Sequence, residues 1–207
     1  LQGTIKCKLE FPNNWGLGSS STLLNNLANL YEINPYDLHF ATTNGSGYDI
    51  ACAGSNSPLT YQVSLNIPDV KKIDWSPVFK NEILFIFLKK KQKSNLEVKR
   101  FKELKKDPNL INKISKITKE IIRANTIEEF EYLLDEHEAI TGQYIKSETV
   151  KSKYFSDYKG SVKSLGAWGG DFILATRKNK KYFFEKGFDT IFSYSELIKE
   201  STFKTVS

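Results

Sequence analysis

A short glycine- and serine-rich segment, residues 16–21, most constrains how this chain can fold. It reads Gly-Leu-Gly-Ser-Ser-Ser and follows an alternating polar and apolar stretch, residues 5–11. Glycine permits the positive backbone angles of a tight turn, and serine is favoured at a helix start. The pattern predicts a half-buried strand, a turn and then a helix. The expected apolar stripe of that helix is Leu23, Leu24, Leu27 and Leu30.

This segment, here called the glycine loop, has residues that suit phosphate binding. Backbone N–H groups at a helix start point outward unpaired, and the helix dipole adds positive potential. Gly16 and Gly18 carry no Cβ atom that would keep phosphate away, and serine hydroxyls bind phosphate or Mg²⁺. No Lys-Ser/Thr pair follows, so the loop is not a P-loop, and the third glycine of a dinucleotide fingerprint is absent. By itself the segment fits a plain turn with serine caps equally well.

The remaining pattern predicts a mixed α+β protein with a domain boundary between residues 66 and 81. A second helix is expected to begin at Asn34-Pro35, because proline is favoured at the first helical position. A capped helix start is expected at residues 126–129. The other expected elements are a loop at 43–47, a short helix at 48–53, strands at 59–65, 83–88, 162–165, 172–176 and 190–194, and helices over 94–158 interrupted near 108, 125 and 141–142.

Composition narrows the class of protein. Apolar residues make up 40% of the chain, which suffices for a globular core, and no apolar run approaches the ~20 residues of a membrane helix. No signal peptide is visible, so the cytoplasm is the expected compartment. Cys7 and Cys52 lie within apolar patterns without metal-ligand spacing, and we expect buried, reduced thiols. The net charge of +6 is scattered over glutamate-rich helices without a nucleic-acid-binding motif, and it suits an anionic small molecule and nucleic acid equally well, so alone it decides nothing.

The sequence contains no methionine, and residue 1 begins directly on the strand-like pattern. We therefore expect that an N-terminal piece is missing, or that residues recorded in another form were dropped. An intact mass of 23.7 kDa would remove this expectation.

Three segments together resemble the motifs of the GHMP kinases, the superfamily of galactokinase, homoserine kinase, mevalonate kinase and phosphomevalonate kinase. Residues 12–21 look like the family's P-x-x-x-G-L-G-S-S-A phosphate loop. Residues 45–52, here called the aspartate segment, read Gly-Ser-Gly-Tyr-Asp-Ile-Ala-Cys and are similar to the segment with the catalytic aspartate. Residues 163–171, the third-motif segment, read Lys-Ser-Leu-Gly-Ala-Trp-Gly-Gly-Asp and resemble a glycine-rich turn between C-terminal strands. Within the superfamily, the residues of these segments most resemble those of phosphomevalonate kinases and of an uncharacterised bacterial branch with a Gly-Tyr-Asp-Ile-Ala segment.

The resemblance implies an α+β fold of two domains. The N-terminal domain, residues 1–75, would be of the ribosomal protein S5 domain 2-like type, with its start missing. The C-terminal domain, residues 76–207, would be ferredoxin-like. ATP would lie between them, and ATP and Mg²⁺ would be the cofactors.

The resemblance also implies roles for particular residues. Asp49 would be catalytic, orienting the acceptor and accepting its proton, and the alternative is that it caps the short helix. Ser20 would contact Mg²⁺, with a plain helix cap as the alternative. The ATP phosphates would be bound by Gly16, Leu17, Gly18, Ser19, Ser20 and Ser21. The substrate would be bound by Ser46, Gly47, Tyr48, Gly166, Ala167, Gly169 and Gly170. An ordinary β-turn is the alternative for the three glycines at 166, 169 and 170.

Some features depart from the family pattern. Trp168 replaces a small residue, so the third-motif turn is bulkier than in the family. The Mg²⁺-binding glutamate of mevalonate kinases has no counterpart, and Glu32 and Asp37 are the nearest carboxylates. The family's first motif, with its lysine, is not among these residues.

Several other residues carry weaker signals. His39 and His137 have no recognisable catalytic partner nearby, and the acidic neighbours of His137 spread around a helix instead of converging on a metal. The lysine run at 89–93 is read as a solvated surface. Tyr144, Tyr154 and Tyr158 are read as packing residues.

The sequence therefore predicts ATP- and Mg²⁺-dependent phosphoryl transfer to a small anionic or hydroxylated metabolite, with phosphomevalonate or mevalonate preferred. If the acceptor is itself a phosphate, it is already ionised and Asp49 need not act as a base. The rival is a GHMP-like protein that binds nucleotide or metabolite without catalysis, which Trp168 and the absent glutamate favour. Neither membrane nor nucleic acid is expected as a partner, and a homodimer is left open.

Overall fold

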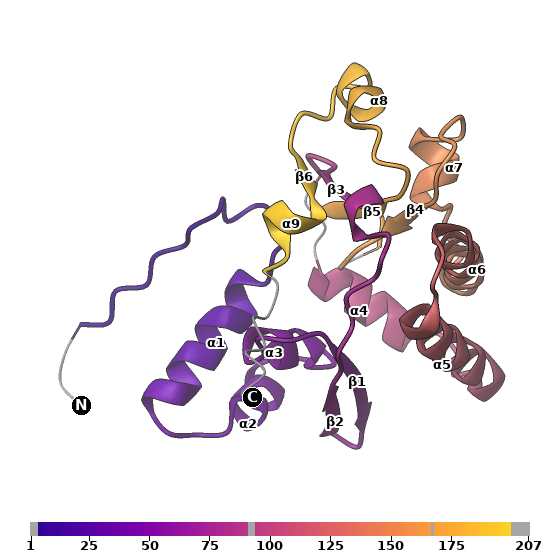
Figure 1. Ribbon diagram of the computed structural model, residues 1–207. Coiled ribbons are helices and arrows are strands. Elements are labelled where there is room, and N and C mark those ends of the chain that lie inside the picture. The colour runs from indigo at the N-terminus through magenta and orange to yellow at the C-terminus, as the bar shows by residue number, and fades with distance from the viewer. Residues whose placement is uncertain (1–3, 91–93, 167, 200–207) are drawn as a thin grey trace, which may run out of the picture. The chain divides into compact units, whose positions relative to one another are not determined.

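The computed structural model describes residues 4–90, 94–166 and 168–199 of the chain (Figure 1). The chain divides into two compact units. Unit 1 is described up to Asp74, and unit 2 begins at Trp75. Each unit has its own secondary structure.

Unit 1 consists of three helices and a β-hairpin. The α1 helix contacts both α2 and α3, and α3 contacts β1. The Asn34 side chain caps α2 by accepting a hydrogen bond from the Tyr36 N–H at 2.9 Å, so the predicted start at Asn34-Pro35 is confirmed. The elements are α1 (Ser19–Leu30), α2 (Pro35–Thr42), α3 (Tyr48–Ala53), β1 (Leu59–Ser64) and β2 (Ile67–Lys72).

The strand predicted at residues 5–11 is wrong. These residues form no regular element, and Ile5 and Leu9 are 49% and 42% exposed. Alternating apolar residues stabilise a strand only when a neighbouring strand takes its hydrogen bonds and a core covers its apolar face, and no described residue does either here. The prediction of buried thiols is wrong for the same stretch and for α3, because Cys7 and Cys52 are both exposed, although both are free.

The predicted apolar stripe of α1 is wrong in part. The buried residues of the helix are Ser21, Asn25 and Ala28. Leu24 and Leu27 are partly buried, whereas Leu23 and Leu30 are 42% and 48% exposed. Residues 21, 25 and 28 have helical spacing too, so periodicity alone does not choose between the two faces. The small, polar face is the one that packs: a Cβ atom at Gly54 would lie 3.4 Å from the Asn25 Oδ1 atom.

The β2 strand was not predicted. It pairs antiparallel with β1 from Leu59↔Lys72 to Ser64↔Ile67. The two residues between the strands, Leu65 and Asn66, have φ values of 51° and 61°. Such hairpin turns usually carry Asn-Gly or Asp-Gly, and a proline inside a run argues against a strand. Because the turn carries a leucine and β2 contains Pro68, the sequence pattern did not predict the hairpin.

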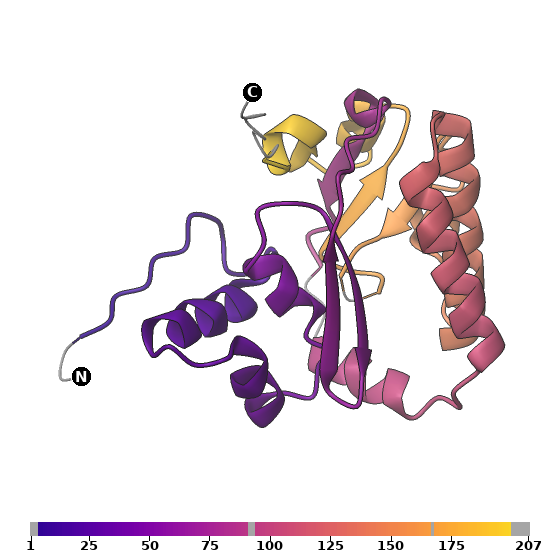
Figure 2. The ribbon, with the colours of Figure 1, turned by 60° about the horizontal axis from the view of Figure 1, so that its bottom comes forward.

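Unit 2 contains a four-stranded antiparallel sheet with the order β4-β5-β3-β6. The α5 and α6 helices run side by side, and α6 lies against β4 (Figure 2). The chain is thus mixed α+β with small antiparallel sheets, as predicted. The elements are η1 (Lys80–Glu82), β3 (Leu84–Phe87), α4 (Ser94–Lys102), α5 (Pro108–Arg123), α6 (Ile127–Ile145), α7 (Val150–Tyr154), β4 (Val162–Ser164), β5 (Phe172–Ala175), α8 (Lys180–Glu185), β6 (Ile191–Ser193) and α9 (Tyr194–Leu197).

Both faces of β3 are covered. On one face, Leu84 and Ile86 belong to an apolar cluster with Ile173 of β5 and with residues from the helical segments, among them Phe155 and Phe183. On the other face, phenylalanines meet: the ring centroids of Phe87 and Phe172 lie 5.3 Å apart, and those of Phe172 and Phe192 lie 6.2 Å apart. Because both faces of this strand are covered, residues 83–88 are all buried. Burial on both faces also explains why the run is apolar at every position.

The predicted start of α6 is confirmed, and the interruption predicted near residues 141–142 is wrong. The Thr126 hydroxyl accepts a hydrogen bond from the Glu129 N–H at 3.2 Å, and the helix then runs through Gly142 to Ile145. Gly142 is needed for space, because an added Cβ atom would lie 2.9 Å from the Ser147 carbonyl oxygen. Among the described helices, none combines the length and apolar character needed to cross a lipid bilayer.

This packing predicts the effect of Gly142→Ala. Alanine favours a helix over glycine by about 1 kcal/mol, but forcing a methyl group against a backbone oxygen costs about 1–3 kcal/mol. We expect a net loss of stability in urea unfolding. Gln143→Ala, at the exposed neighbouring position, is the control and should change little. A Gly142→Ala variant more stable than the wild type would show that the contact is not tight.

Candidate functional site

The glycine loop turns left-handed twice before α1 begins. Gly16 and Gly18 have φ values of 68° and 75°, and Gly18 is the N-cap residue of α1. No side chain caps this helix start, and no acidic residue lies in its first turn. The first amides of α1 are therefore free of competing side-chain acceptors and of repelling charge within the described residues.

The three serines of the loop differ in their surroundings. The Ser21 hydroxyl is buried and donates a hydrogen bond to the Gly18 carbonyl oxygen at 2.8 Å. This hydrogen bond of the hydroxyl closes the loop, and the predicted contact of Ser21 with phosphate stays a prediction. Ser20, predicted as the Mg²⁺ contact, is exposed, and Ser19 and Leu17 are partly buried. Ser20 is the serine with the most accessible side chain for a ligand.

The aspartate segment places Asp49 in the first turn of α3. Gly47 is buried, is the N-cap residue and has a φ of 84°. The Asp49 Oδ1 atom accepts a hydrogen bond from the Ile50 N–H at 3.1 Å, and no side chain caps the helix. Asp49 is not the N-cap residue, but its carboxylate accepts a hydrogen bond from a first-turn amide, so both its catalytic role and the alternative that it caps the helix stay predictions. Of its predicted neighbours, Ser46 and Tyr48 are exposed.

The groups around Asp49 are uncharged donors. Desolvation and then the charge of Asp49 raise the pKa values of Tyr48 and Cys52. The pKa of Tyr61, on β1, is raised by desolvation, by Tyr36 and by Asp49. Among the described residues, no lysine or arginine contributes to these pKa shifts. Asp49 is the carboxylate that raises the pKa of all three side chains.

His39, which sequence reasoning set aside, lies beneath the loop before α3. Its ring is buried, and the Thr43 hydroxyl lies 3.1 Å from its Nε2 atom. A Cβ atom at Gly45 would come within 3.3 Å of the same ring. The spacing of residues in the sequence does not predict this contact, because it depends on how α2 packs.

The third-motif segment forms the turn between β4 and β5 in unit 2. Gly166 and Gly169 have φ values of 61° and 80°, and a Cβ atom at Gly166 would meet nothing within 4 Å. Gly170 is buried, and Ala167, predicted as a substrate contact, lies outside the described residues. The Leu165 N–H donates to the Phe172 carbonyl at 3.1 Å and closes the turn. The first two motifs belong to unit 1 and this one to unit 2.

Trp168 lies beside α6. Its Cζ2 atom lies 3.6 Å from the place where Gly142 would carry a Cβ atom, which is an ordinary van der Waals distance. The indole that the third-motif segment carries in place of a small residue therefore packs near Gly142 without requiring a glycine there.

A buried charge cluster supports the same segment. The Lys163 ammonium lies 3.1 Å from Glu138 Oε1 and 3.1 Å from His137 Nδ1, and Glu138 is 3% exposed. Burial raises the pKa of Glu138 against the opposing effect of Lys163. Burial and Lys163 lower the pKa of His137 to about 4. The described residues contain no group of three or more His, Cys, Asp or Glu placed to hold a metal.

The cluster predicts a pH dependence of stability. Between pH 6.5 and about 4 the unfolded chain protonates His137 and the folded protein does not, so stability falls as the pH falls. His137→Gln removes this loss while keeping a polar group beside Lys163. At pH 4.5, relative to pH 7, the variant should gain roughly 2 kcal/mol over the wild type in urea unfolding. Equal pH dependence of the two proteins would contradict a neutral His137, because Glu138 titrates in both.

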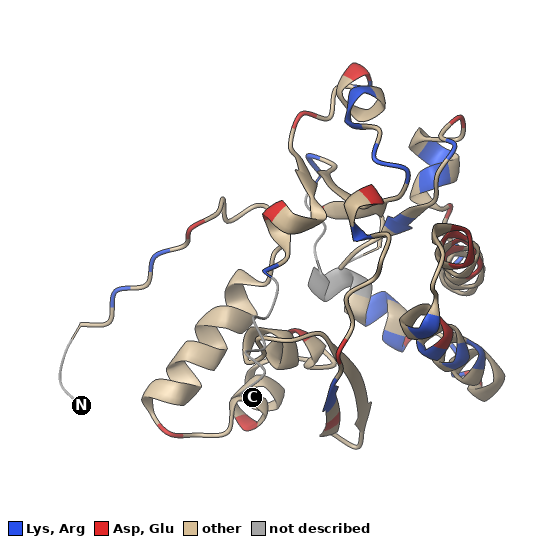
Figure 3. Ribbon diagram, viewed as in Figure 1, with Lys and Arg blue, Asp and Glu red and all other residues tan. Residues whose placement is uncertain are grey.

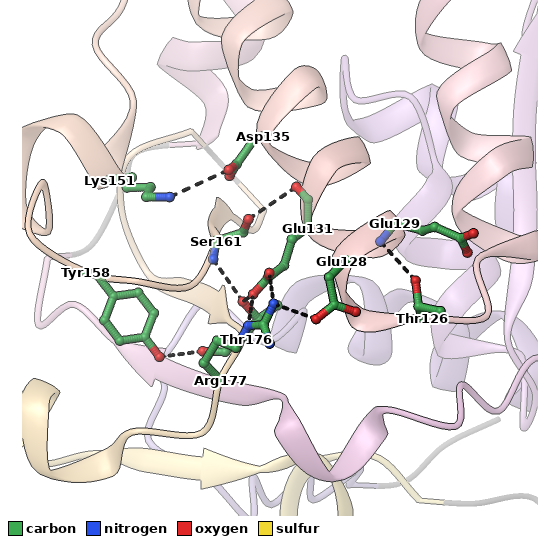
Figure 4. A network of polar contacts seen from close by, with 10 residues as sticks. All are labelled: Thr126, Glu128, Glu129, Glu131, Asp135, Lys151, Tyr158, Ser161, Thr176 and Arg177. Atoms are coloured by element: carbon green, nitrogen blue, oxygen red, sulfur yellow. Dashed lines mark hydrogen bonds and ion pairs between the residues drawn. The ribbon is translucent and has the colours of Figure 1, made fainter.

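Two surface hollows of unit 2 lie away from the third-motif segment. One, of about 300 Å³, lies between α5 and α6. The other, of about 500 Å³, is lined by Asp157, Tyr158, Lys159, Arg177, Asn179 and Tyr182. The Arg177 guanidinium is already bound to Glu131 at 2.5 Å and to Glu128 at 3.0 Å (Figure 4). This network ties α6 to the end of β5 and leaves the arginine little capacity for an anion.

The basic excess of the chain belongs to unit 2. Residues 4–74 carry four lysines and six acidic residues, whereas Lys and Arg are frequent on the helices of unit 2 (Figure 3). Lys89 of the predicted solvated run pairs with Asp189 at 2.8 Å, and residues 91–93 lie outside the described residues. Tyr144 and Tyr158 donate to the Lys105 and Thr176 carbonyls, which fits their predicted packing roles.

Comparison with known proteins gives a likeness of fold. No protein-family model matches the chain, and no curated protein matches it. The structure is similar to the crystal structure of a Lin0012 protein from Listeria innocua, with a TM-score of 0.59 and 20% sequence identity over 84% of this chain. The match covers 62% of that chain, so this chain spans less than two thirds of its length. At this identity the likeness bears on the fold alone.

Proposed function

We propose that the protein is an ATP-dependent small-molecule kinase of the GHMP type, with the glycine loop as its phosphate site and Asp49 as its catalytic residue. The observation that carries the proposal lies in unit 1. The left-handed glycines at 16 and 18 open an α1 start that has no side-chain cap and no acidic residue. The same unit holds Asp49 in the first turn of a second glycine-capped helix.

The glycine loop suits a triphosphate. Unpaired amides and the helix dipole stabilise negative charge, and phosphoryl transfer depends mostly on such positioning and electrostatics. The residues proposed to line the phosphates are Gly16, Leu17, Gly18, Ser19 and Ser20, while Ser21 holds the loop's shape. The exposed Ser20 hydroxyl would join the Mg²⁺ ligands. When bound, ATP supplies the γ-phosphoryl group.

Asp49 would orient the acceptor and, where the acceptor is an alcohol, accept its proton. Its uncharged neighbours leave the carboxylate as the charged group of this part of unit 1. For a phosphate acceptor the role reduces to positioning. Phosphomevalonate or mevalonate remains the proposed acceptor, and this choice rests on the sequence resemblance.

The order of elements in unit 2 supports the ferredoxin-like assignment. The β3 strand is followed by helices, then by the β4–β5 hairpin, then by α8 and β6. This is a β-α-β-β-α-β order, and the sheet order β4-β5-β3-β6 places β3 and β5 in the centre. We propose the S5-like assignment for unit 1 on the motifs alone. In unit 2, the open space at Gly166 would let a substrate approach the backbone of the third-motif turn.

A second candidate function is nucleotide or metabolite binding without catalysis. It is favoured by the absence of an acidic residue in the first turn of α1, since Mg²⁺ then lacks a carboxylate there. Glu32 and Asp37 follow the end of α1 and begin α2, so neither belongs to that turn. Trp168, which replaces a small residue in the third-motif turn, favours this candidate as well.

Turnover separates the two functions. ATP consumption by the full-length protein with Mg²⁺ should appear with one member of a panel of mevalonate, phosphomevalonate, homoserine and sugars. Asp49→Asn should lower kcat by about 10²–10⁴-fold with an alcohol acceptor, because the general base is lost, and should leave ATP binding intact. Asp37→Asn, an exposed carboxylate of the same unit, is the control. An unchanged rate in Asp49→Asn would refute the catalytic assignment, and silence across the panel with ATP bound would favour the second candidate.

A further inference from the structure

The loop before α3 is held between side chains from two other elements, His39 of α2 and Tyr61 of β1. The His39 ring, 4% exposed, lies under Gly45 at 3.3 Å from the position of a Cβ atom. The Gly45 N–H faces the Thr43 hydroxyl at 3.4 Å, and that hydroxyl contacts the same ring. The buried His39 ring therefore supports this side of the loop.

Tyr61 holds the other side of the loop. Its hydroxyl donates a hydrogen bond to the Ser46 carbonyl oxygen at 2.6 Å, across fifteen residues of sequence. A Cβ atom at Gly47 would lie 3.1 Å from the same hydroxyl oxygen and 3.4 Å from Phe40 Cζ. Any other residue at position 47 would push Tyr61 away and would also have to adopt a φ of 84°.

Backbone hydrogen bonds connect residues 46 and 47 to Asp49. The Gly47 carbonyl accepts hydrogen bonds from the Ile50 N–H at 3.1 Å and the Ala51 N–H at 3.2 Å. The Ile50 N–H also donates to Asp49 Oδ1 at 3.1 Å. The peptide that Tyr61 fixes thus begins the turn whose amide orients the Asp49 carboxylate.

We propose that Tyr61 is a positioning residue for Asp49, acting through its hydrogen bond to the Ser46 carbonyl, with His39 as the opposing support. The inference rests on the proposed function, since it deepens the role of the same carboxylate. Without the Tyr61 hydroxyl, the Ser46–Gly47 peptide can rotate and the first turn of α3 loses its fixed start. A misplacement of about 1 Å at a reacting group can cost up to ~10²-fold in rate.

Tyr61→Phe tests the proposal, because it keeps the ring and removes only the donor. We expect kcat to fall by about 10-fold, with the KM for ATP unchanged, because positioning affects the reacting carboxylate and not the glycine loop. Amide hydrogen exchange at Ile50 and Ala51 should become faster. Tyr31→Phe removes a phenol that is half-exposed at the end of α1, and it should change neither quantity.

A second readout is independent of turnover. The carbon NMR chemical shift of the Asp49 carboxyl at pH 7 should change in Tyr61→Phe, because the carboxylate accepts its hydrogen bond from the Ile50 N–H, whereas Tyr31→Phe should match the wild type. If the wild type transfers no phosphoryl group, the proposed function fails, and exchange together with this chemical shift still decides whether Tyr61 positions Asp49. Wild-type exchange and a wild-type chemical shift in Tyr61→Phe would overturn the inference. A rise in the KM for ATP without a change in kcat would overturn it as well.

Discussion

Left-handed backbone at three glycines starts the two helices on which the proposed chemistry depends. Gly18 begins α1, Gly47 begins α3, and Gly16 turns the chain into the first of these. Side chains at such φ values are costly, and at Gly18 and Gly47 a Cβ atom would also come within 3.0 Å of Ser21 Oγ and 3.1 Å of Tyr61 Oη. Neither helix has a side-chain cap, so the glycines leave the first amides of α1 open and hold Asp49 in the first turn of α3. Phosphate binding and acceptor activation would thus both depend on a helix that begins at a left-handed glycine.

Unit 2 is organised by the covered strand β3 and by the way in which α6 supports the turn between β4 and β5. The Lys163–Glu138 pair joins the helix to β4 just before the turn, and Trp168 within the turn lies near Gly142 of α6. A half-buried lysine beside a neutral histidine needs the carboxylate to offset its desolvation. The turn is therefore anchored at its β4 end, while Gly166 within it keeps open space around its backbone.

Sequence reasoning was reliable where local chemistry decides the structure. Asn34-Pro35, Thr126 and the apolar run at 83–88 each identify an element whose start or burial follows from neighbouring residues. It failed where a distant partner decides: alternation could not make a strand of residues 5–11 without a neighbour, and spacing could not choose the packed face of α1. Gly142 does not interrupt α6, and the crowding that favours glycine there comes from the Ser147 carbonyl oxygen, which the helical pattern does not reveal. His39 and Tyr61 escaped notice for the same reason, since their contacts with the loop depend on tertiary packing. The roles of the glycine loop and Asp49 in catalysis remain predictions.

The most direct measurement is amide NMR of the full-length protein titrated with ATP and Mg²⁺. Open amides at a glycine-capped helix start should move first and furthest when phosphate binds, because their hydrogen-bond partner changes from water to a charged oxygen. We predict the largest shifts at Gly16, Gly18 and the first turn of α1. Saturable shifts confined to unit 2, or no shifts at all with millimolar ATP, would contradict the assignment of the glycine loop as the phosphate site.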